Sequence, residues 1–309
     1  MRLNKPKFWD KRIGVISIIL FPITLLYLAI IYFKKTFTRA KSFKTPIICV
    51  GNVYLGGTGK TPTSILLANE LQNLGKKPTI LRKLYNNHND EYDLIKNSFK
   101  NLILNKNRIA GILEAEKLGF DIVILDDGLQ DYRIHKTLSI VCFNQNQLVG
   151  NGLVLPSGPL RENLNVLSKV DIVIVNGERS ISFEEKILKI NKNLKIFYSF
   201  YKPINLEKFK NKKLLALAGI GNPENFFQLL ERNNLKIEKK IVMPDHYMLS
   251  KKEFLNIINE ANINNYQVIM TEKDYFKIKS FSTNKIDFLK VDLIIKNQEK
   301  LLSMIKEKI

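Results

Sequence analysis

The sequence predicts an α/β protein with a mostly parallel sheet, a second, smaller α/β lobe and an N-terminal membrane-anchor helix. A run of 21 uncharged residues, 13–33, lies near the N-terminus, and from residue 45 short apolar runs alternate with helical patterns. Strands that alternate with helices are typical of parallel sheets. Because a second such cycle begins near residue 200, we expect an anchor over 1–44, a first domain over 45–200 and a smaller C-terminal domain over 201–309.

The uncharged run at 13–33 is long enough to cross a bilayer. As a helix it would measure about 31 Å, close to the hydrocarbon thickness of a membrane. The first 45 residues carry ten Lys or Arg and one acid, Asp10, within a chain whose net charge is +20. Basic flanks attract anionic lipid by roughly 1 kcal/mol per residue, so an anionic membrane surface is favoured over nucleic acid. Pro22 leaves open whether the helix spans the membrane or is only partly inserted.

The first domain is expected to contain several buried strands and two helices. Apolar runs predict strands over 45–52, 77–83, 101–105, 120–128, 138–144 and 171–177. The helices are predicted over 62–74 and 108–118, and a glycine follows each of them. The polar stretch 84–93 and the Gly/Pro-rich stretch 149–162 are predicted to be loops.

The second lobe repeats the alternation on a smaller scale. A strand is predicted over 213–221 and a helix over 223–233, followed by a loop at 243–249. Ser250 and Glu253 have the spacing of a capping box, which predicts that a helix begins there. A strand and loop over 266–274 and an amphipathic helix over 298–309 complete the lobe.

A glycine-rich loop lies between the first predicted strand and the first predicted helix. It ends in Gly-Lys-Thr, the ending of a phosphate-binding P-loop in its required strand–loop–helix context, although a strict motif has glycine where Tyr54 stands. Lys60 would reach the β- and γ-phosphates of ATP, and Thr61 would ligate Mg²⁺. The sequence therefore predicts a P-loop NTPase-like fold whose nucleotide-binding residues are Tyr54, Leu55, Gly56, Gly57, Thr58, Gly59, Lys60 and Thr61.

Two adjacent acids, Asp126 and Asp127, end the predicted strand at 120–128. An apolar strand that ends in a carboxylate is the usual source of a second Mg²⁺ ligand in P-loop proteins. The sequence leaves open which of the two faces the metal. Asp90 and Glu91 follow the second strand, and His246 lies in a turn-like stretch; taken alone, all three are typical of solvated loop residues.

Two classes of function are compatible with a nucleotide loop close to a membrane. One is a membrane-bound phosphoryl-transfer enzyme, and the other is a membrane-tethered NTPase switch. Partition-type switches carry a lysine early in the loop, where this chain reads Val53-Tyr54-Leu55. Guanine-specific proteins carry N/T-K-x-D after a strand, whereas "SKVD" at 168–171 precedes one. Both observations favour the enzyme.

Seven motifs in one order resemble the tetraacyldisaccharide 4′-kinase (lipid A 4′-kinase) family. They are "VGN…GGTGKTP" (50–62), "DDGLQ" (126–130), "GNGLVLPSGPLRE" (150–162), "DIVIVN" (171–176), "AGIGNPENFF" (218–227), "PDHY" (244–247) and "TEKD" (271–274). The resemblance covers nearly the whole chain. It implies an ATP-dependent phosphotransferase that phosphorylates the 4′-hydroxyl of tetraacyldisaccharide 1-phosphate to form lipid IV-A, at the cytosolic face of a bacterial inner membrane. No nucleic acid and no obligate protein partner are expected.

The resemblance also implies roles for particular residues. The family's catalytic aspartate falls on Asp90 and its partner histidine on His246. The Mg²⁺-linked acids fall on Asp126 and Asp127. The family's Arg-Glu pair falls on Arg161 and Glu162, which with Asp90, His246 and Lys60 complete the expected catalytic set.

The chain departs from the family pattern at two places. The region after the second strand, "LRKLYNNHNDEY" (81–92), is short and has lost the family's glycines. Asp131 stands where the family often has histidine. These departures leave a degenerate, lipid-binding relative with little activity as an alternative to the active kinase.

Overall fold

The computed structural model describes residues 6–85, 89–244, 247, 249–278 and 286–309. The chain forms two compact units, which are described separately. The larger unit contains the residues up to Leu84, Phe99–Phe200 and Ile295–Ile309, and the smaller contains Tyr85–Ser98 and Tyr201–Ile294. The C-terminal helix therefore belongs to the larger unit, and a short segment of the expected first domain belongs to the smaller one.

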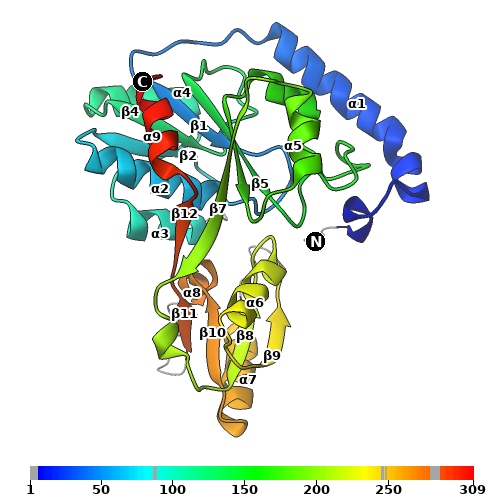
Figure 1. The fold of residues 1–309 in the computed structure, drawn as a ribbon, viewed down its shortest axis with the longest axis vertical. Helices are drawn as coiled ribbons and strands as arrows, with labels where there is room; N and C mark the ends of the chain where they lie inside the picture. The colour runs from blue at the N-terminus through cyan, green and yellow to red at the C-terminus, as the bar shows by residue number, and fades with distance from the viewer. Residues whose placement is uncertain (1–5, 86–88, 245–246, 248, 279–285) are drawn as a thin grey trace. The chain divides into compact units, whose positions relative to one another are not determined.

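The larger unit contains most of an eight-stranded sheet within the described residues, in the order β12-β7-β6-β5-β1-β4-β2-β3 (Figure 1). Of β12, only Ile295 is assigned to this unit. Neighbouring strands from β7 to β3 pair in parallel, as predicted. The strands are β1 Ile47–Gly51, β2 Pro78–Lys83, β3 Leu102–Asn105, β4 Ile122–Asp126, β5 Leu138–Asn144, β6 Ile172–Asn176, β7 Lys195–Pro203 and β12 Val291–Ile295.

Both faces of this sheet are covered, which explains its uninterrupted apolar strands. Every residue of β1 is buried. Ile47 and Cys49 point to one face, where they share a core with Ile112 of one helix and Phe183 of another. The helices of the larger unit, besides the N-terminal one, are α2 Lys60–Asn73, α4 Arg108–Lys117, α5 Ile181–Leu188 and α9 Gln298–Lys306.

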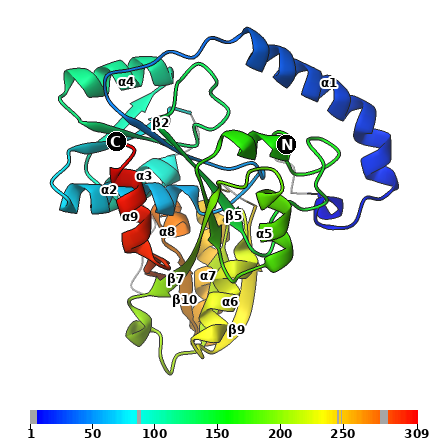
Figure 2. The same cartoon turned by 45° about the horizontal axis from the view of Figure 1, so that its top comes forward.

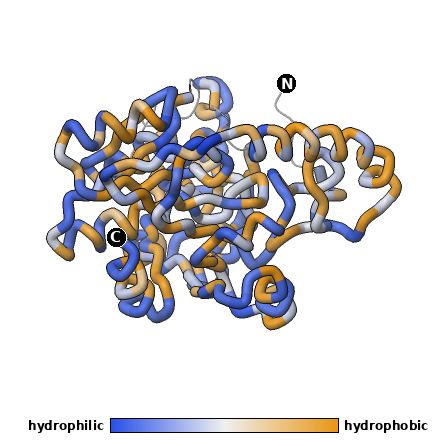
Figure 3. Tube along the Cα trace, turned by 90° about the horizontal axis from the view of Figure 1, so that it is seen from above, coloured by the Kyte–Doolittle hydropathy of each residue, from blue (hydrophilic) through white to orange (hydrophobic). Residues whose placement is uncertain are grey.

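A short 3-10 helix, η1 (Lys7–Asp10), and a long helix, α1 (Val15–Phe37), precede the sheet, and an extended connection leads from α1 to β1 (Figure 2). By length and composition alone α1 could cross a membrane. Figure 3, coloured by hydropathy, shows that hydrophobic residues predominate along this helix. Its buried residues are Ser17 and Thr24, whereas large apolar side chains such as Leu26, which is 68% exposed, cover the rest. The helix therefore has one side bonded to the protein and an apolar side facing outward.

The smaller unit contains a four-stranded parallel sheet in the order β11-β10-β8-β9. Leu214 and Ala216 of β8 pack with α6, and the alternating residues Leu215 and Leu217 pack with α7, so the two helices cover opposite faces. The predicted capping box at Ser250 is confirmed. The elements are β8 Leu214–Ala218, α6 Pro223–Arg232, β9 Ile237–Val242, α7 Lys251–Ile263, β10 Gln267–Thr271, α8 Glu272–Ile278 and β11 Ile286–Leu289.

The predicted loop over 84–93 is wrong from Asn89 onward, because a helix, α3 (Asn89–Ser98), begins there. The helix forms because Tyr92 and Ile95, spaced three residues apart on one face, are both buried. It packs against α8, and Lys273 of α8 pairs with Glu91 at 3.2 Å. This tertiary packing stabilises a segment whose polar composition alone indicates a loop.

Candidate active site

The glycine-rich loop connects β1 to the first turn of α2. Gly59 directly precedes the helix with φ of 90°, a left-handed conformation that glycine adopts without strain, and Gly56 has φ of 139°. The backbone N–H of Thr63 donates to the carbonyl of Gly59 at 3.1 Å and so begins the helical bonding. Lys60 therefore starts the helix, at the end where backbone N–H groups attract anions.

The 149–162 segment braces the start of this loop. The N–H of Leu55 donates to the carbonyl of Pro159 at 2.8 Å, and the N–H of Arg161 donates to the carbonyl of Val53 at 2.7 Å. The Tyr54 ring is fully buried, and its hydroxyl donates to Asp10 at 2.7 Å. The side chain of Tyr54 is thus engaged by the N-terminal segment.

Asp126, at the end of β4, is fully buried next to the start of α2. Its carboxylate accepts hydrogen bonds from the hydroxyl of Thr61 at 3.0 Å and from the hydroxyl of Ser64 at 3.1 Å. Arg82, at the end of β2, forms an ion pair with the same carboxylate and donates to the Thr61 hydroxyl at 3.0 Å. Asp126 therefore lies among hydroxyl groups and one guanidinium.

Asp127 has different neighbours. Its backbone φ of 60° turns the chain sharply after β4. Its carboxylate Oδ1 lies 2.8 Å from Arg161 Nη1 and 3.8 Å from Lys60 Nζ. Burial alone would raise the pKa of Asp127, but the nearby cations, Lys60 first and Arg161 second, lower it to about 2. Asp127 thus stays charged and holds two cations beside the glycine-rich loop.

Glu162 is buried and faces a separate polar group. Its carboxylate accepts from the Gln130 amide at 3.0 Å and from the Tyr132 hydroxyl at 2.7 Å. The same Gln130 nitrogen donates to the carbonyl of Asn52, directly before the glycine-rich loop, at 3.0 Å. Burial raises the pKa of Tyr132, and the adjacent carboxylate raises it further, so the phenol remains the donor. Glu162 thereby links three segments that surround the loop.

Asp131, where the resembled family often has histidine, is bonded to two arginines. Arg133 donates to its carboxylate at 2.8 Å and 2.9 Å, and Arg108 lies 3.5 Å away. Burial alone would raise the pKa of Asp131, but the hydrogen bond and charge of Arg133 lower it. Arg108 also donates to the carbonyl of Asp127 at 2.6 Å, so Asp131 helps to fix a residue that contacts the site.

The two residues expected to act on the sugar hydroxyl belong to the smaller unit. Asp90 is in the first turn of α3, but its side chain lies outside the described residues. His246 also lies outside them. The roles that the resemblance implies for these two residues stay predictions.

The donor set around Thr61 and Asp126 fits Mg²⁺. Two oxygens bound to Mg²⁺ at about 2.0–2.1 Å and at right angles lie about 3 Å apart, and the two oxygens here are 3.0 Å apart. Among the described residues there is no group of three or more His, Cys, Asp or Glu that could hold a metal. Mg²⁺ is commonly held by one or two protein oxygens together with substrate phosphates, so one carboxylate and one hydroxyl are a sufficient donor set.

Two buried polar atoms next to the glycine-rich loop have no hydrogen-bond partner among the described residues. They are the hydroxyl oxygen of Thr58 and the amide oxygen of Asn52. Buried polar atoms are nearly always bonded. Their position in and beside the loop is therefore consistent with a ligand that completes the site.

Sequence reasoning missed the residues that hold the acids in place: Ser64, Arg82, Arg108, Gln130 and Tyr132. It also missed Asn52, whose amide donates to the carbonyls of Tyr54 and Gly56 in the glycine-rich loop. One signal could have found Arg82, because it ends a strand next to β4 and ligands bind at the carboxyl ends of parallel strands. Ser64 lies three residues after Thr61 in α2 and so on the same face of the helix, which would also have suggested it. Asn52 and Gln130 lie within two of the quoted motifs, which do not by themselves indicate their bonding partners. Arg108 and Tyr132 have no local signal.

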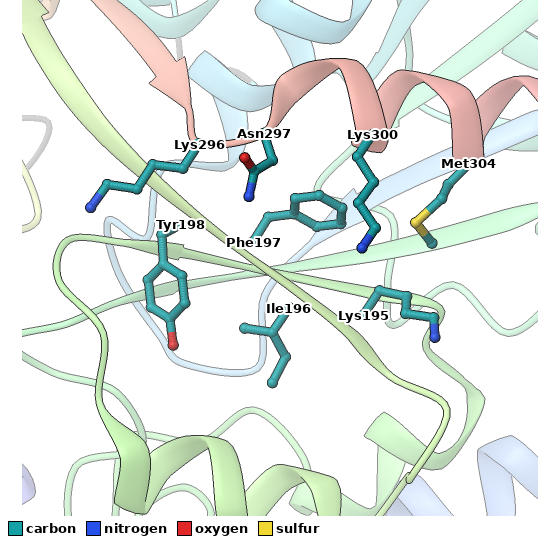
Figure 4. A pocket seen from close by; sticks show the side chains of 8 residues that line it. All are labelled: Lys195, Ile196, Phe197, Tyr198, Lys296, Asn297, Lys300 and Met304. Atoms are coloured by element: carbon teal, nitrogen blue, oxygen red, sulfur yellow. The ribbon is translucent and has the colours of Figure 1, made fainter.

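A surface pocket elsewhere in the larger unit contains none of the predicted site residues. It lies between β7 and α9, and Figure 4 shows the side chains of Lys195, Lys300 and Met304 there. Lys296, also at this pocket, lies 3.7 Å from Glu178. The pocket contains lysines but no carboxylate or hydroxyl pair comparable to Asp126 and Thr61.

The fold and the site together define a P-loop NTPase-like phosphotransferase: a parallel sheet, a glycine-rich loop leading into a helix, and a strand-end acid bonded to the loop threonine. Comparison with known proteins identifies the family of this phosphotransferase. The family model described as tetraacyldisaccharide-1-P 4′-kinase matches residues 16–309. This chain belongs to the tetraacyldisaccharide 4′-kinase family, as its motifs predicted.

Individual relatives support the same family assignment. The chain is 41% identical to the tetraacyldisaccharide 4′-kinase of Pelagibacter ubique over 307 residues, covering 97% of this chain and 96% of that one. It is 34% identical to that of Rickettsia bellii over 324 residues, covering 100% and 99%. A crystal structure of LpxK from Aquifex aeolicus in complex with ATP superimposes with a TM-score of 0.72 at 24% identity, covering 95% of this chain and 99% of that one. The structural match supports the fold.

Proposed function

We propose that this protein transfers the γ-phosphate of ATP to the 4′-hydroxyl of tetraacyldisaccharide 1-phosphate, which yields lipid IV-A in lipid A biosynthesis. The observation that carries the proposal is that two adjacent acids contact different groups. Asp126 lies against the Thr61 hydroxyl at 3.0 Å, and Asp127 lies against Arg161 and Lys60. Phosphoryl transfer needs both a metal-binding oxygen pair and cations that neutralise the developing charge.

The nucleotide is bound by the glycine-rich loop and the N-terminus of α2. Lys60, at that N-terminus, neutralises the phosphate oxygens, while Asp127 holds the lysine and Arg161 in reach of the loop. Cations that are already oriented need no rearrangement as charge moves to the transferred phosphate, which is why such groups lower the barrier. Arg161 is therefore assigned to phosphate stabilisation, and Glu162 to holding the loop through Gln130.

Thr61 and Asp126 would hold Mg²⁺, which when bound would supply positive charge against the phosphate groups of ATP. Arg82 now pairs with the Asp126 carboxylate and with the Thr61 hydroxyl. Ser64 holds the second carboxylate oxygen at 3.1 Å, so Asp126 keeps its orientation from the protein alone.

The acceptor hydroxyl needs a base, because its pKa is far too high for it to attack unaided. Asp90 is assigned this role by the family resemblance. His246 is assigned to orient Asp90 and tune its basicity, as in other catalytic dyads. Both positions belong to the smaller unit, whereas the glycine-rich loop belongs to the larger one.

The substrate is a lipid, and α1 provides the membrane contact. The exposed side of α1 is apolar, and lysines such as Lys34 and Lys35 lie in its last turn. Anionic headgroups attract such residues. We assign the catalytic units to the cytosolic face of a bacterial inner membrane, since ATP is supplied there.

The experiment that tests the kinase against an NTPase switch measures ATP hydrolysis and lipid phosphorylation together. Purified protein in detergent is given ATP and Mg²⁺, with tetraacyldisaccharide 1-phosphate, with DNA or RNA, or with neither. A kinase hydrolyses ATP slowly alone and forms phosphorylated lipid only with the disaccharide. Strong stimulation by polynucleotide without a lipid product would overturn the proposal.

A further inference from the structure

Two residues to which the proposed function gives no role, Asp10 and Tyr54, are hydrogen-bonded to each other. Asp10 is the only acid in the first 45 residues, and Tyr54 occupies the position of the first glycine in a strict P-loop motif. The Tyr54 hydroxyl donates to the Asp10 carboxylate at 2.7 Å. An acid that precedes α1 is therefore bonded directly to the start of the glycine-rich loop.

The direction and strength of this bond follow from burial. Tyr54 is fully buried, and burial, reinforced by the bond to Asp10, raises its pKa, so the hydroxyl keeps its proton and donates. Leaving a buried donor without an acceptor costs more free energy than an ordinary hydrogen bond contributes to stability. The loop conformation that buries Tyr54 therefore depends on Asp10.

Asp10 is held in place because η1 packs on the 149–162 segment. The Trp9 indole N–H donates to the carbonyl of Pro156 at 3.0 Å, and the N–H of Asn151 donates to the carbonyl of Trp9 at 2.7 Å. The backbone approach is close, since a Cβ at Gly150 would lie 2.6 Å from that carbonyl oxygen. η1 is thus fixed to the protein independently of Tyr54.

The helix α1 contacts the same segment further along. The Thr24 hydroxyl donates to the Ser157 hydroxyl at 2.8 Å, and both residues are buried. The Tyr27 hydroxyl donates to the carbonyl of Arg161 at 3.0 Å. Because Arg161 is itself one of the two cations that Asp127 holds, α1 is bonded directly to the backbone of a residue of the site.

We propose that Asp10 and Tyr54 are positioning residues for the nucleotide: their contact couples the N-terminal, membrane-facing segment to the conformation of the glycine-rich loop. The proposal rests on the proposed ATP-dependent function. It gives the N-terminal segment a part in the nucleotide site besides membrane attachment. It also gives a role to Asp10, the one acid in the basic segment 1–45, and to Tyr54, which stands where the strict motif has glycine.

The test compares four variants with the full-length protein. Tyr54→Phe removes the donor, Asp10→Ala removes the acceptor, Asp10→Asn keeps an oxygen acceptor, and the fourth variant combines the first two. Tyr198→Phe is the matched control, because the Tyr198 hydroxyl donates to Glu184 at 2.6 Å on the same unit and away from the loop. The dissociation constant of a fluorescent ATP analogue is measured without lipid, and kcat and KM for ATP and for lipid are measured in the transfer assay.

We expect Tyr54→Phe and Asp10→Ala to weaken nucleotide binding by about 3- to 10-fold and to raise KM for ATP but not for lipid. Asp10→Asn and Tyr198→Phe should stay within about twofold of wild type. The double variant should be no worse than the poorer single variant, since both remove one bond. Unchanged nucleotide binding in both single variants, or additive losses, would overturn the proposal. If wild type binds nucleotide but makes no lipid product, the proposed function fails while the binding measurements still decide the positioning role.

Discussion

The Thr61 hydroxyl donates to the Asp126 carboxylate across 3.0 Å and so joins the first turn of α2 to the end of β4. The next residue, Asp127, is bonded instead to Arg161 and lies near Lys60. The sequence left open which of the two acids would serve a metal. Their different neighbours favour Asp126 as the metal ligand, with Asp127 as the residue that holds the cations.

The Thr61 hydroxyl can be tested by two substitutions of similar size. Thr61→Ser keeps the hydroxyl and should retain activity within several-fold of wild type. Thr61→Val removes it, and we expect transfer to fall by about 10²- to 10³-fold and the Mg²⁺ concentration for half-maximal rate to rise. A Thr61→Val enzyme with a normal Mg²⁺ requirement would contradict the assignment of the metal to this position.

The charge on Asp127 should stabilise the protein in a defined pH range. Its pKa is lowered to about 2 from the ordinary value of 3.8, so the stabilisation is fully present above about pH 4 and is lost as the pH falls toward 2. The difference in unfolding free energy between wild type and Asp127→Asn should stay constant from pH 7 to about pH 5 and shrink below about pH 4. Denaturant titrations at several pH values measure it. A difference that is constant down to pH 2 would show that the cations do not hold this charge.

Asp90 should behave as a base rather than as a nucleotide ligand. Asp90→Asn is expected to lower kcat by about 10²- to 10⁴-fold with nucleotide binding unchanged. Asp93→Asn is the control, because Asp93 is exposed on the same helix, α3. His246→Ala should lower kcat less, and the double variant should cost less than the two losses combined if the residues act as a unit. An active Asp90→Asn enzyme would assign the base elsewhere.

The apolar side of α1 should be the membrane contact. Leu26 on α1 is 68% exposed, and Ile263 on α7 is 84% exposed. Leu26→Asp should reduce flotation with anionic liposomes several-fold, because a carboxylate is costly to bring into an apolar layer. Ile263→Asp should leave flotation unchanged. Equal effects of the two substitutions would mean that another surface binds the membrane.

Much of the fold could be predicted because its signals are local. The strands β1 and β4 are uninterrupted apolar runs, and the glycine-rich loop lies directly between β1 and α2. β9 was missed because half of its residues, IEKKIV, are charged and most of them are exposed, as an edge strand allows. α3 was missed because its stability comes from tertiary packing: it packs against α8, and Tyr92 and Ile95 are buried.

The partners of the site residues were less predictable than the residues themselves. Lys60 and Thr61 belong to a motif, whereas Arg82 reaches Asp126 from a strand 44 positions away in the chain. The bond between Asp10 and Tyr54 also spans 44 positions. Such contacts depend on which strands and helices become neighbours, and that order is not encoded in any one window of the sequence.

The most direct test of the account is the identity of the product. Wild-type protein, Lys60→Ala and the control Lys76→Ala, whose lysine is exposed after α2, are incubated with ATP, Mg²⁺ and tetraacyldisaccharide 1-phosphate, and the lipid is analysed by mass spectrometry with fragmentation. We expect wild type and Lys76→Ala to add one phosphate group at the 4′ position, and Lys60→Ala to be slower by at least about 10²-fold. A wild-type protein that adds no phosphate, or a Lys60→Ala enzyme that adds it at the normal rate, would contradict the account.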